Sequence, residues 1–151
     1  RVTDKYDVPL IINDRLDICL AVDAAGVHLG QADLPCSEAR RILGAEKIIG
    51  VSAATPEEAA KAQSDGADYL GVGAVFATST KTNTRPVTAE TIRAIRSAVD
   101  IPFVVIGGVN SENISGLYGL GINGAAVISA IISQPDITAA ARKMRQAAER
   151  L

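Results

Sequence analysis

The feature that most constrains the fold of this chain is a regular alternation of short apolar runs with helical stretches. Most of these runs are continuously hydrophobic and rich in β-branched residues, a pattern typical of parallel strands covered by helices. The expected strands are Val8–Asn13, Gly26–Leu29, Lys47–Ser52, Tyr69–Val75, Phe103–Gly107 and Ala125–Ser129. The sequence therefore predicts an α/β fold built on a parallel sheet.

The segments between the strands are expected to be helices: Asp17–Ala24, Ser37–Leu43, Pro56–Asp65, Ala89–Val99, Glu112–Leu120 and Ile137–Leu151. Thr55, Pro56 and Glu58 have the spacing of an N-cap, a first-turn proline and a capping box. Gly66 and Gly121 come directly after helices, where a left-handed residue is common. This alternation fits either a doubly wound sheet or a barrel.

The positions of the polar residues favour the barrel. Polar or glycine-rich clusters follow nearly every expected strand: Asn13-Asp14, Gln31 to Asp33, Ser52, Thr78 to Lys81, Gly107-Gly108 and Ser129. A barrel gathers its functional groups at the carboxyl ends of its strands. A doubly wound sheet binds its ligand near one switch point, and no GxGxxG motif follows the first strand here. We therefore predict a (β/α)8 TIM barrel.

The last two strands indicate which part of the barrel the chain contains. Gly107-Gly108 would let the backbone approach a phosphate closely, and Ser129 opens a short helix whose N-terminus attracts anions. An ordinary tight turn and an N-cap are the alternative. Such barrels often bind phosphate after strands 7 and 8. The chain would then hold strands 3 to 8, as one domain over residues 1–151 that lacks the first two β/α units.

Composition excludes several classes of function. The net charge of −2 provides no basic field for nucleic acid, and no apolar run reaches the roughly 20 residues of a membrane helix. Cys19 and Cys36 lack metal-ligand spacing, so we expect reduced thiols in a cytoplasmic protein. The expected partners are small molecules, and a homo-oligomer stays an open alternative.

Two polar clusters are candidates for binding a metal and phosphate groups. Asp14 and Asp33, with Asn13, end neighbouring strands and could converge on Mg²⁺, which takes one or two carboxylates together with phosphate oxygens and water. A helix cap and a polar loop are the alternative explanation. Hydroxyl groups beside Lys81, in the loop that includes Thr78 and Thr80, suit a phosphate or diphosphate group, and a solvated loop is the alternative.

The sequence offers no clear base or nucleophile. Ser52 ends a strand and would face the site, but no base lies near it in sequence. The single histidine, His28, lies within an expected strand, so we do not favour a Ser–His–Asp site. This absence suggests chemistry driven by a good leaving group and a metal ion.

These motifs together resemble the thiamin phosphate synthase family. The matching stretches cover essentially the whole chain in family order: residues 9–15 (PLIINDR), 26–31 (GVHLGQ) with Asp33, 50–52 (GVS), 66–73 (GADYLGVG), 78–81 (TSTK), 106–108 (IGG) and 127–130 (VISA). The resemblance implies a (β/α)8 barrel that joins a pyrimidine methyl diphosphate to a thiazole ethyl phosphate. Pyrophosphate is released in an Mg²⁺-dependent step, and the thiazole nitrogen attacks the resulting pyrimidine methyl cation.

The resemblance also implies roles for individual residues. Asp14 and Asp33 would bind Mg²⁺. Asn13, Ser52 and Lys81 would contact the pyrimidine diphosphate, with Ser52 and Lys81 as the catalytic pair. The thiazole phosphate would be held by Thr78, Thr80, Gly108, Ile128 and Ser129.

One family motif is absent. The Gln-x-Arg-x-Lys sequence of strand 2 has no counterpart here, because the chain begins just before the expected strand 3. Residues 1–151 alone would leave two unpaired sheet edges, so we expect them to be inactive and poorly soluble.

Three other functions stay open. A thiazole tautomerase of the same barrel family is disfavoured by Asp14, Asp33 and Lys81 together. A sugar-phosphate epimerase would use the same phosphate-binding glycines but not the Thr-x-Thr-Lys loop. A non-catalytic domain that binds a precursor would explain the missing strand-2 motif.

Overall fold

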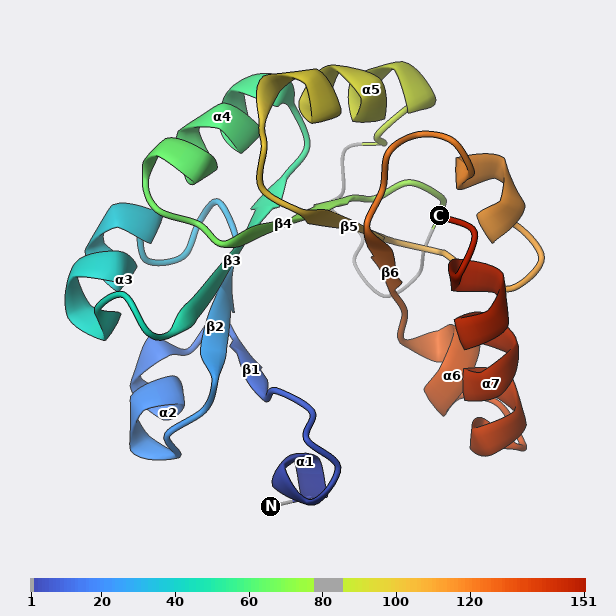
Figure 1. Cartoon of the computed structure of the whole chain (residues 1–151), viewed down its shortest axis with the longest axis horizontal. Helices are drawn as coiled ribbons and strands as arrows, with labels where there is room; N and C mark the ends of the chain where they lie inside the picture. The colour runs from blue at the N-terminus through green and yellow to red at the C-terminus, as the bar shows by residue number, and fades with distance from the viewer. Residues whose placement is uncertain (1, 78–85) are drawn as a thin grey trace.

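A computed structural model describes residues 2–77 and 86–151 of the chain. Its central feature is a curved, six-stranded parallel sheet with the strand order β1-β2-β3-β4-β5-β6 (Figure 1). The strands are β1 (Ile11–Asn13), β2 (Gly26–Leu29), β3 (Ile48–Ala53), β4 (Tyr69–Gly73), β5 (Phe103–Ile106) and β6 (Gly124–Ala126).

Most helices lie around the outer side of the curved sheet, whereas α1 (Val2–Lys5) lies apart from them at its open side (Figure 1). The others are α2 (Leu16–Ala21), α3 (Cys36–Leu43), α4 (Pro56–Ser64), α5 (Ala89–Ala98), the 3-10 helix η1 (Ile114–Leu117), α6 (Ser129–Ile132) and α7 (Ile137–Ala148). In the described ranges, no helix combines the length and the apolar character that crossing a membrane requires.

The strand order decides between the two predicted architectures. Each strand pairs with its neighbour in sequence, so the order never reverses as it would in a doubly wound sheet. The sheet is therefore a parallel half-barrel, which agrees with the barrel prediction as far as six strands go. The eight-stranded closure remains a prediction.

The alternation along β3 shows how the sheet separates core from cavity. Ile49, Val51 and Ala53 are buried, and α3 and α4 pack against this strand. Gly50 and Ser52 alternate with them, and successive side chains of a strand point to opposite faces. One face of the sheet thus forms the core beneath the helices, while the other lines the interior of the half-barrel.

The signals that begin and end helices were predicted well. The Thr55 hydroxyl accepts a hydrogen bond from the Glu58 N–H at 3.2 Å, and Pro56 occupies the first helical turn. The Glu58 carboxylate reaches back to the Ala54 N–H at 2.7 Å, one residue before the N-cap. Gly66 has a φ of 95°, as a residue that ends a helix in the left-handed region should. Gly121 also has a positive φ, 73°, but no helix ends directly before it, because the 3-10 helix there ends at Leu117.

The predicted helix over Glu112–Leu120 is wrong. Only the 3-10 helix η1 forms there, because side chains compete for the backbone. The Asn110 carboxamide accepts hydrogen bonds from the N–H groups of Glu112 and Asn113 at 2.9 and 3.1 Å, which builds a turn in place of a helical start. The short helix α1 was not predicted.

Several strand bounds also differ from those predicted. β1 begins at Ile11, not Val8, because its pairing with β2 covers only Ile11–Asn13. β6 ends at Ala126, not Ser129, because its register with β5 ends at the pair Ile106 and Ala126. Strand length here follows the partner strand, which an apolar run alone does not reveal.

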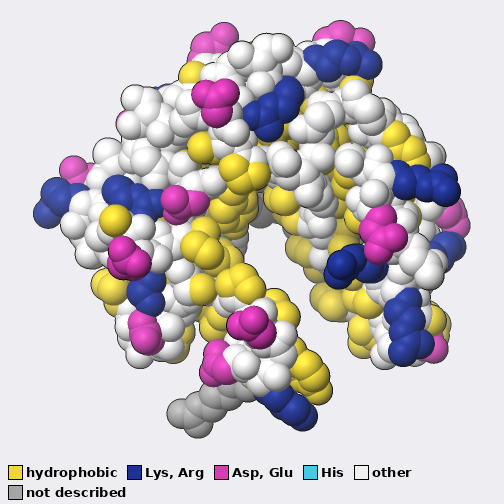
Figure 2. Space-filling view, in the orientation of Figure 1, with side chains coloured by type: hydrophobic (Ala, Val, Ile, Leu, Met, Phe, Trp, Pro, Cys, Tyr) yellow, Lys and Arg dark blue, Asp and Glu magenta, His cyan; other side chains and the backbone are white. Residues whose placement is uncertain are grey.

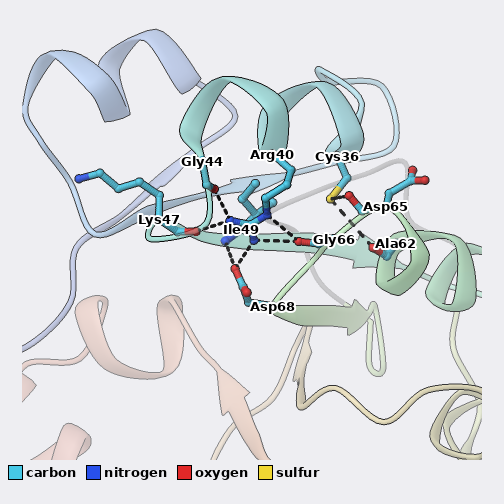
Figure 3. Close-up of polar contacts among 9 residues, drawn as sticks. All are labelled: Cys36, Arg40, Gly44, Lys47, Ile49, Ala62, Asp65, Gly66 and Asp68. Carbon is cyan, nitrogen blue, oxygen red and sulfur yellow. Dashed lines mark hydrogen bonds and ion pairs between the residues drawn. The ribbon is translucent and has the colours of Figure 1, made fainter.

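A cluster around Arg40 fastens the amino ends of β3 and β4 (Figure 3). Its guanidinium donates hydrogen bonds, 2.6 to 3.0 Å long, to the carbonyl oxygens of Gly44, Lys47 and Gly66 and to the Asp68 carboxylate. Asp68 in turn accepts from the Ile49 N–H at 2.7 Å. This cluster lies at the end of the strands opposite to the predicted site, where barrels keep stabilising residues.

Both cysteines are free thiols, as predicted, and both are buried. Burial raises the pKa of the Cys36 thiol, which donates to the Asp65 carbonyl oxygen at 3.6 Å. Burial also raises the pKa of Cys19. Both side chains therefore act as core residues.

Candidate active site

A cavity of about 710 Å³ occupies the interior of the half-barrel at the carboxyl ends of the strands. Figure 2 shows the molecule hollowed between its N-terminal part and α6–α7, with hydrophobic side chains along the hollow. All predicted site residues within the described ranges line this cavity: Asn13, Asp14, Asp33, Ser52, Gly108, Ile128 and Ser129. Residues that span most of the sequence are thus brought to one place.

Asp14 has an unusual backbone. Its φ of 65° lies in the left-handed region, which non-glycine residues seldom adopt. Its N–H donates to the His28 carbonyl oxygen at 2.8 Å, so the residue directly after β1 is tied to β2. Strained backbone of this kind occurs often at functional sites.

Asp33 is held by the turn that follows β2. Its Oδ2 accepts a hydrogen bond from the Gly30 N–H at 2.7 Å. A Cβ at position 30 would lie 3.0 Å from the same oxygen, so glycine lets the carboxylate approach the backbone closely. The turn therefore fixes a half-buried carboxylate at the cavity wall.

The two carboxylates suit a hard cation that shares its shell with a substrate. Among residues 2–77 and 86–151, no group of three or more His, Cys, Asp or Glu side chains forms a metal cluster. Mg²⁺ does not require one, because it commonly takes one or two carboxylates and completes its shell with phosphate oxygens and water. The donor set of Asp14 and Asp33 therefore fits Mg²⁺ in the presence of a diphosphate.

Ser52 does have a base beside it, contrary to the expectation from sequence. His28 Nε2 lies 3.0 Å from Ser52 Oγ, and His28 Nδ1 lies 3.0 Å from the Tyr69 hydroxyl. The third member is a phenol, not a carboxylate, so a Ser–His–Asp triad is absent from this cluster. The proximity depends on strand register, which a search along the sequence does not detect.

Gly107 and Gly108 are required by packing as well as by conformation. Their φ values are 97° and 64°. A Cβ on Gly108 would lie 2.4 Å from the Ala77 carbonyl oxygen, and one on Gly107 would lie 2.5 Å from Ala74 Cβ. The pair thus lets the segment after β4 cross close to the end of β5, a role that the phosphate hypothesis did not anticipate.

α6 begins at the cavity. The Ile128 carbonyl oxygen accepts hydrogen bonds from the N–H groups of Ile131 and Ile132, both at 3.0 Å. Ser129 is the first helical residue, as predicted. The first N–H groups of a helix have no intrahelical acceptor, so this backbone suits an anion such as phosphate.

Thr78, Thr80 and Lys81 lie outside the described residues. The residues on either side of the range 78–85 form backbone hydrogen bonds near the cavity. Phe76 N–H donates to the Gly107 carbonyl oxygen at 3.1 Å, and Val87 N–H donates to the Ala74 carbonyl oxygen at 2.8 Å.

Sequence reasoning missed some residues of the cavity wall, including Tyr69, Gly71 and Glu58. The Gln31 carboxamide also lines it, and donates to the Ser52 carbonyl oxygen at 2.6 Å. Gln31 follows β2 after Gly30 and belongs to the polar residues that the sequence placed after this strand, although no role was predicted for it.

Comparisons with known proteins identify the family of the chain. The profile of the family described as thiamine monophosphate synthase matches residues 1–131. The chain is 58% identical to a thiamine-phosphate synthase of Ruminiclostridium cellulolyticum over 143 residues, 95% of this chain and 68% of the relative. It is 50% identical to that of Clostridium botulinum over 151 residues, 100% of this chain and 71% of the relative.

A solved structure gives the same result. The thiamine phosphate pyrophosphorylase of Pyrococcus furiosus superposes with a TM-score of 0.89 at 41% identity, covering 97% of this chain and 70% of that one. The family profile, the sequence relatives and the solved structure all identify the same family. The chain belongs to the thiamine monophosphate synthase family.

Proposed function

We propose that this chain is a thiamine-phosphate synthase, a transferase that joins a pyrimidine methyl diphosphate to a thiazole ethyl phosphate and releases pyrophosphate. The observation that supports this most is that one cavity is lined by two carboxylates, a polar Ser–His–Tyr cluster and the start of α6. A site for two phosphorylated reactants needs distinct anion-binding elements, and these come from opposite ends of the described sequence.

Each part of the cavity receives a role. Asp14 and Asp33 hold Mg²⁺, which would supply positive charge to the diphosphate when bound. Asn13, Ser52 and Lys81 contact the pyrimidine diphosphate. The thiazole phosphate is held by Thr78, Thr80, Gly108, Ile128 and Ser129.

The chain accelerates the reaction by orientation and by charge. Lys81 offsets the negative charge that develops on the departing pyrophosphate. The resulting pyrimidine methyl cation is attacked by the thiazole nitrogen, so no protein base is needed to form the new carbon–nitrogen bond. The half-barrel wall keeps both reactants in line, which removes much of the entropic cost of their encounter.

The whole-protein features belong to the same proposal. The complete enzyme is an eight-unit barrel of one domain, in which two further β/α units cover the open edges of β1 and β6. The enzyme acts in the cytoplasm on small phosphorylated molecules.

The test is a coupled assay on the complete polypeptide that contains this sequence. Incubation with both phosphorylated precursors and Mg²⁺ should yield thiamin phosphate and an equal amount of pyrophosphate. A correctly folded protein that forms neither product would contradict the proposal. Conversion between thiazole isomers without Mg²⁺ would instead support the tautomerase.

A further inference from the structure

Three neighbouring strands place a histidine and a tyrosine on either side of a glycine. His28 of β2 is in register with Gly50 of β3, and Gly50 is in register with Tyr69 of β4. Their side chains therefore face the same side of the sheet. The two rings meet across the glycine, with centroids 5.5 Å apart.

Two glycines provide the space that these rings need. A Cβ on Gly50 would lie 2.1 Å from Tyr69 Cζ and 2.4 Å from its hydroxyl oxygen. A Cβ on Gly71 would lie 2.9 Å from His28 Cε1. Any larger residue at position 50 would displace the phenol directly.

The tautomer of His28 sets the direction of the two hydrogen bonds in this cluster. Burial raises the pKa of Tyr69, which keeps its phenol protonated and able to donate. The Tyr69 hydroxyl lies 3.0 Å from His28 Nδ1, the nitrogen that can accept from it. A neutral imidazole that accepts at Nδ1 carries its proton on Nε2, and so donates to Ser52 Oγ at 3.0 Å.

This direction determines what Ser52 can offer to a ligand. When the imidazole donates from Nε2 to Oγ, the hydroxyl proton of Ser52 points elsewhere. The Gln31 carboxamide holds the Ser52 carbonyl oxygen at 2.6 Å, which fixes the backbone of the same residue. Ser52 lines the cavity, so its proton is presented to a hydrogen-bond acceptor there.

We propose that Tyr69 and His28 are positioning residues that make Ser52 a hydrogen-bond donor to a ring nitrogen of the aminopyrimidine. This inference rests on the proposed function for the identity of the ligand, but not for the direction of the hydrogen bonds. It implies that the site selects the pyrimidine through an acceptor atom, in preference to its exocyclic amine.

The direction can be measured without any substrate. His28 is the single histidine of the described sequence, so a preparation of the complete polypeptide labelled with ¹⁵N-histidine can be assigned by His28→Gln. We expect a neutral imidazole protonated at Nε2, with Nδ1 unprotonated. In Tyr69→Phe, which keeps the ring and removes the hydroxyl, Nδ1 should lose its donor and the Nε2–H form should no longer dominate. A proton on Nδ1 in the unmodified protein would overturn the inference.

Steady-state kinetics test the consequence for substrate binding. Loss of one hydrogen bond corresponds to roughly a tenfold weaker interaction. Tyr69→Phe should raise the KM for the pyrimidine diphosphate by about that factor and change the KM for the thiazole phosphate less than about twofold. His28→Gln, whose amide can still donate towards Ser52, should retain more activity than His28→Leu. Equal losses in these two variants, or equal changes in both KM values, would contradict a positioning role.

Gly50→Ala offers an independent check, because it displaces the Tyr69 ring without removing a polar group. It should reproduce the tautomer change and the KM change of Tyr69→Phe. Gly116→Ala is the matched control, since a Cβ there meets nothing within 4 Å. An unmodified protein that shows the Nε2–H form but no synthase activity would contradict the proposed function alone.

Discussion

The single residues of the site differ in how far the sequence revealed them. Asp14 and Asp33 could be predicted because polar residues after apolar strands gather at one edge of a parallel sheet. The partnership of Ser52 with His28 could not, since these residues are 24 positions apart and meet only through the register of β2 and β3. Site residues that directly follow one strand can therefore be predicted from the sequence, whereas contacts between side chains of two different strands cannot.

The charge of Asp33 can be separated from its structural hydrogen bond. Asp33→Asn keeps an oxygen that can accept from the Gly30 N–H and removes the negative charge. We expect kcat/KM to fall by roughly 100-fold or more, with a higher Mg²⁺ concentration needed for half-maximal rate. The melting temperature should stay close to that of the unmodified protein. Unchanged Mg²⁺ dependence in this variant would rule Asp33 out as a metal ligand.

Gly108 should be intolerant of a side chain for two separable reasons. Gly108→Ala combines a φ of 64° with a Cβ 2.4 Å from the Ala77 carbonyl oxygen. Gly119→Ala is the matched control, because it has a φ of 75° but nothing within 4 Å of its Cβ. Left-handed strain alone costs of order 1–3 kcal/mol. Denaturant unfolding should show a clearly larger loss for Gly108→Ala, and equal losses would mean that the close contact is unimportant.

The elements of the fold follow local rules except where side chains or partner strands override them. α4 formed as predicted because Thr55, Pro56 and Glu58 fix its start. The segment after Asn110 failed as an α-helix because that side chain bonds the backbone in a competing turn. Strand ends moved by a few residues wherever pairing, and not hydrophobicity, set the limit.

The Arg40 cluster should stabilise the joints between α3, β3 and β4 without affecting catalysis. Arg40→Ala leaves several carbonyl oxygens without their donor, which should lower the free energy of unfolding by about 3 kcal/mol. Arg41→Ala is the matched control. Arg41 is 71% exposed and pairs with Glu38 one turn earlier in α3, whereas Arg40 is 22% exposed. Urea denaturation distinguishes the two, and an equally small effect of both would show that the cluster is dispensable.

The buried thiols provide a test of how firmly the helices that carry them, α2 and α3, pack in the folded protein. Burial raises the pKa of Cys36, and the thiolate is the reactive form, so this side chain should resist alkylation at neutral pH. The same holds for Cys19. We expect slow labelling by iodoacetamide in the folded protein and rapid labelling of both in denaturant. Fast labelling of the native protein would mean that α3 opens away from α4 easily.

The molecule as a whole is a half-barrel whose two edge strands, β1 and β6, each have one paired neighbour in the described structure. Large apolar side chains are exposed towards both ends of the sheet: Val8, Leu10, Ile106, Ile128 and Ile132. The chain spans about 70% of the length of its relatives. Both observations are consistent with the proposal that two further β/α units complete the barrel.

Isolation of residues 1–151 tests that proposal directly. Exposed apolar surface and unpaired parallel edges favour self-association. The isolated segment should bind a hydrophobic dye strongly, elute as aggregates in size-exclusion chromatography and show no synthase activity. The complete polypeptide is the control and should do none of these. A monomeric, active isolated segment would show that six strands suffice.

The most direct measurement is product formation by the complete polypeptide with both phosphorylated precursors, with and without Mg²⁺, beside Asp33→Asn. We expect thiamin phosphate and pyrophosphate in equal amounts, formed only with Mg²⁺, and loss of nearly all activity in the variant. Product formation that is independent of Mg²⁺ and unaffected by Asp33→Asn would contradict a metal-assisted departure of pyrophosphate in this cavity.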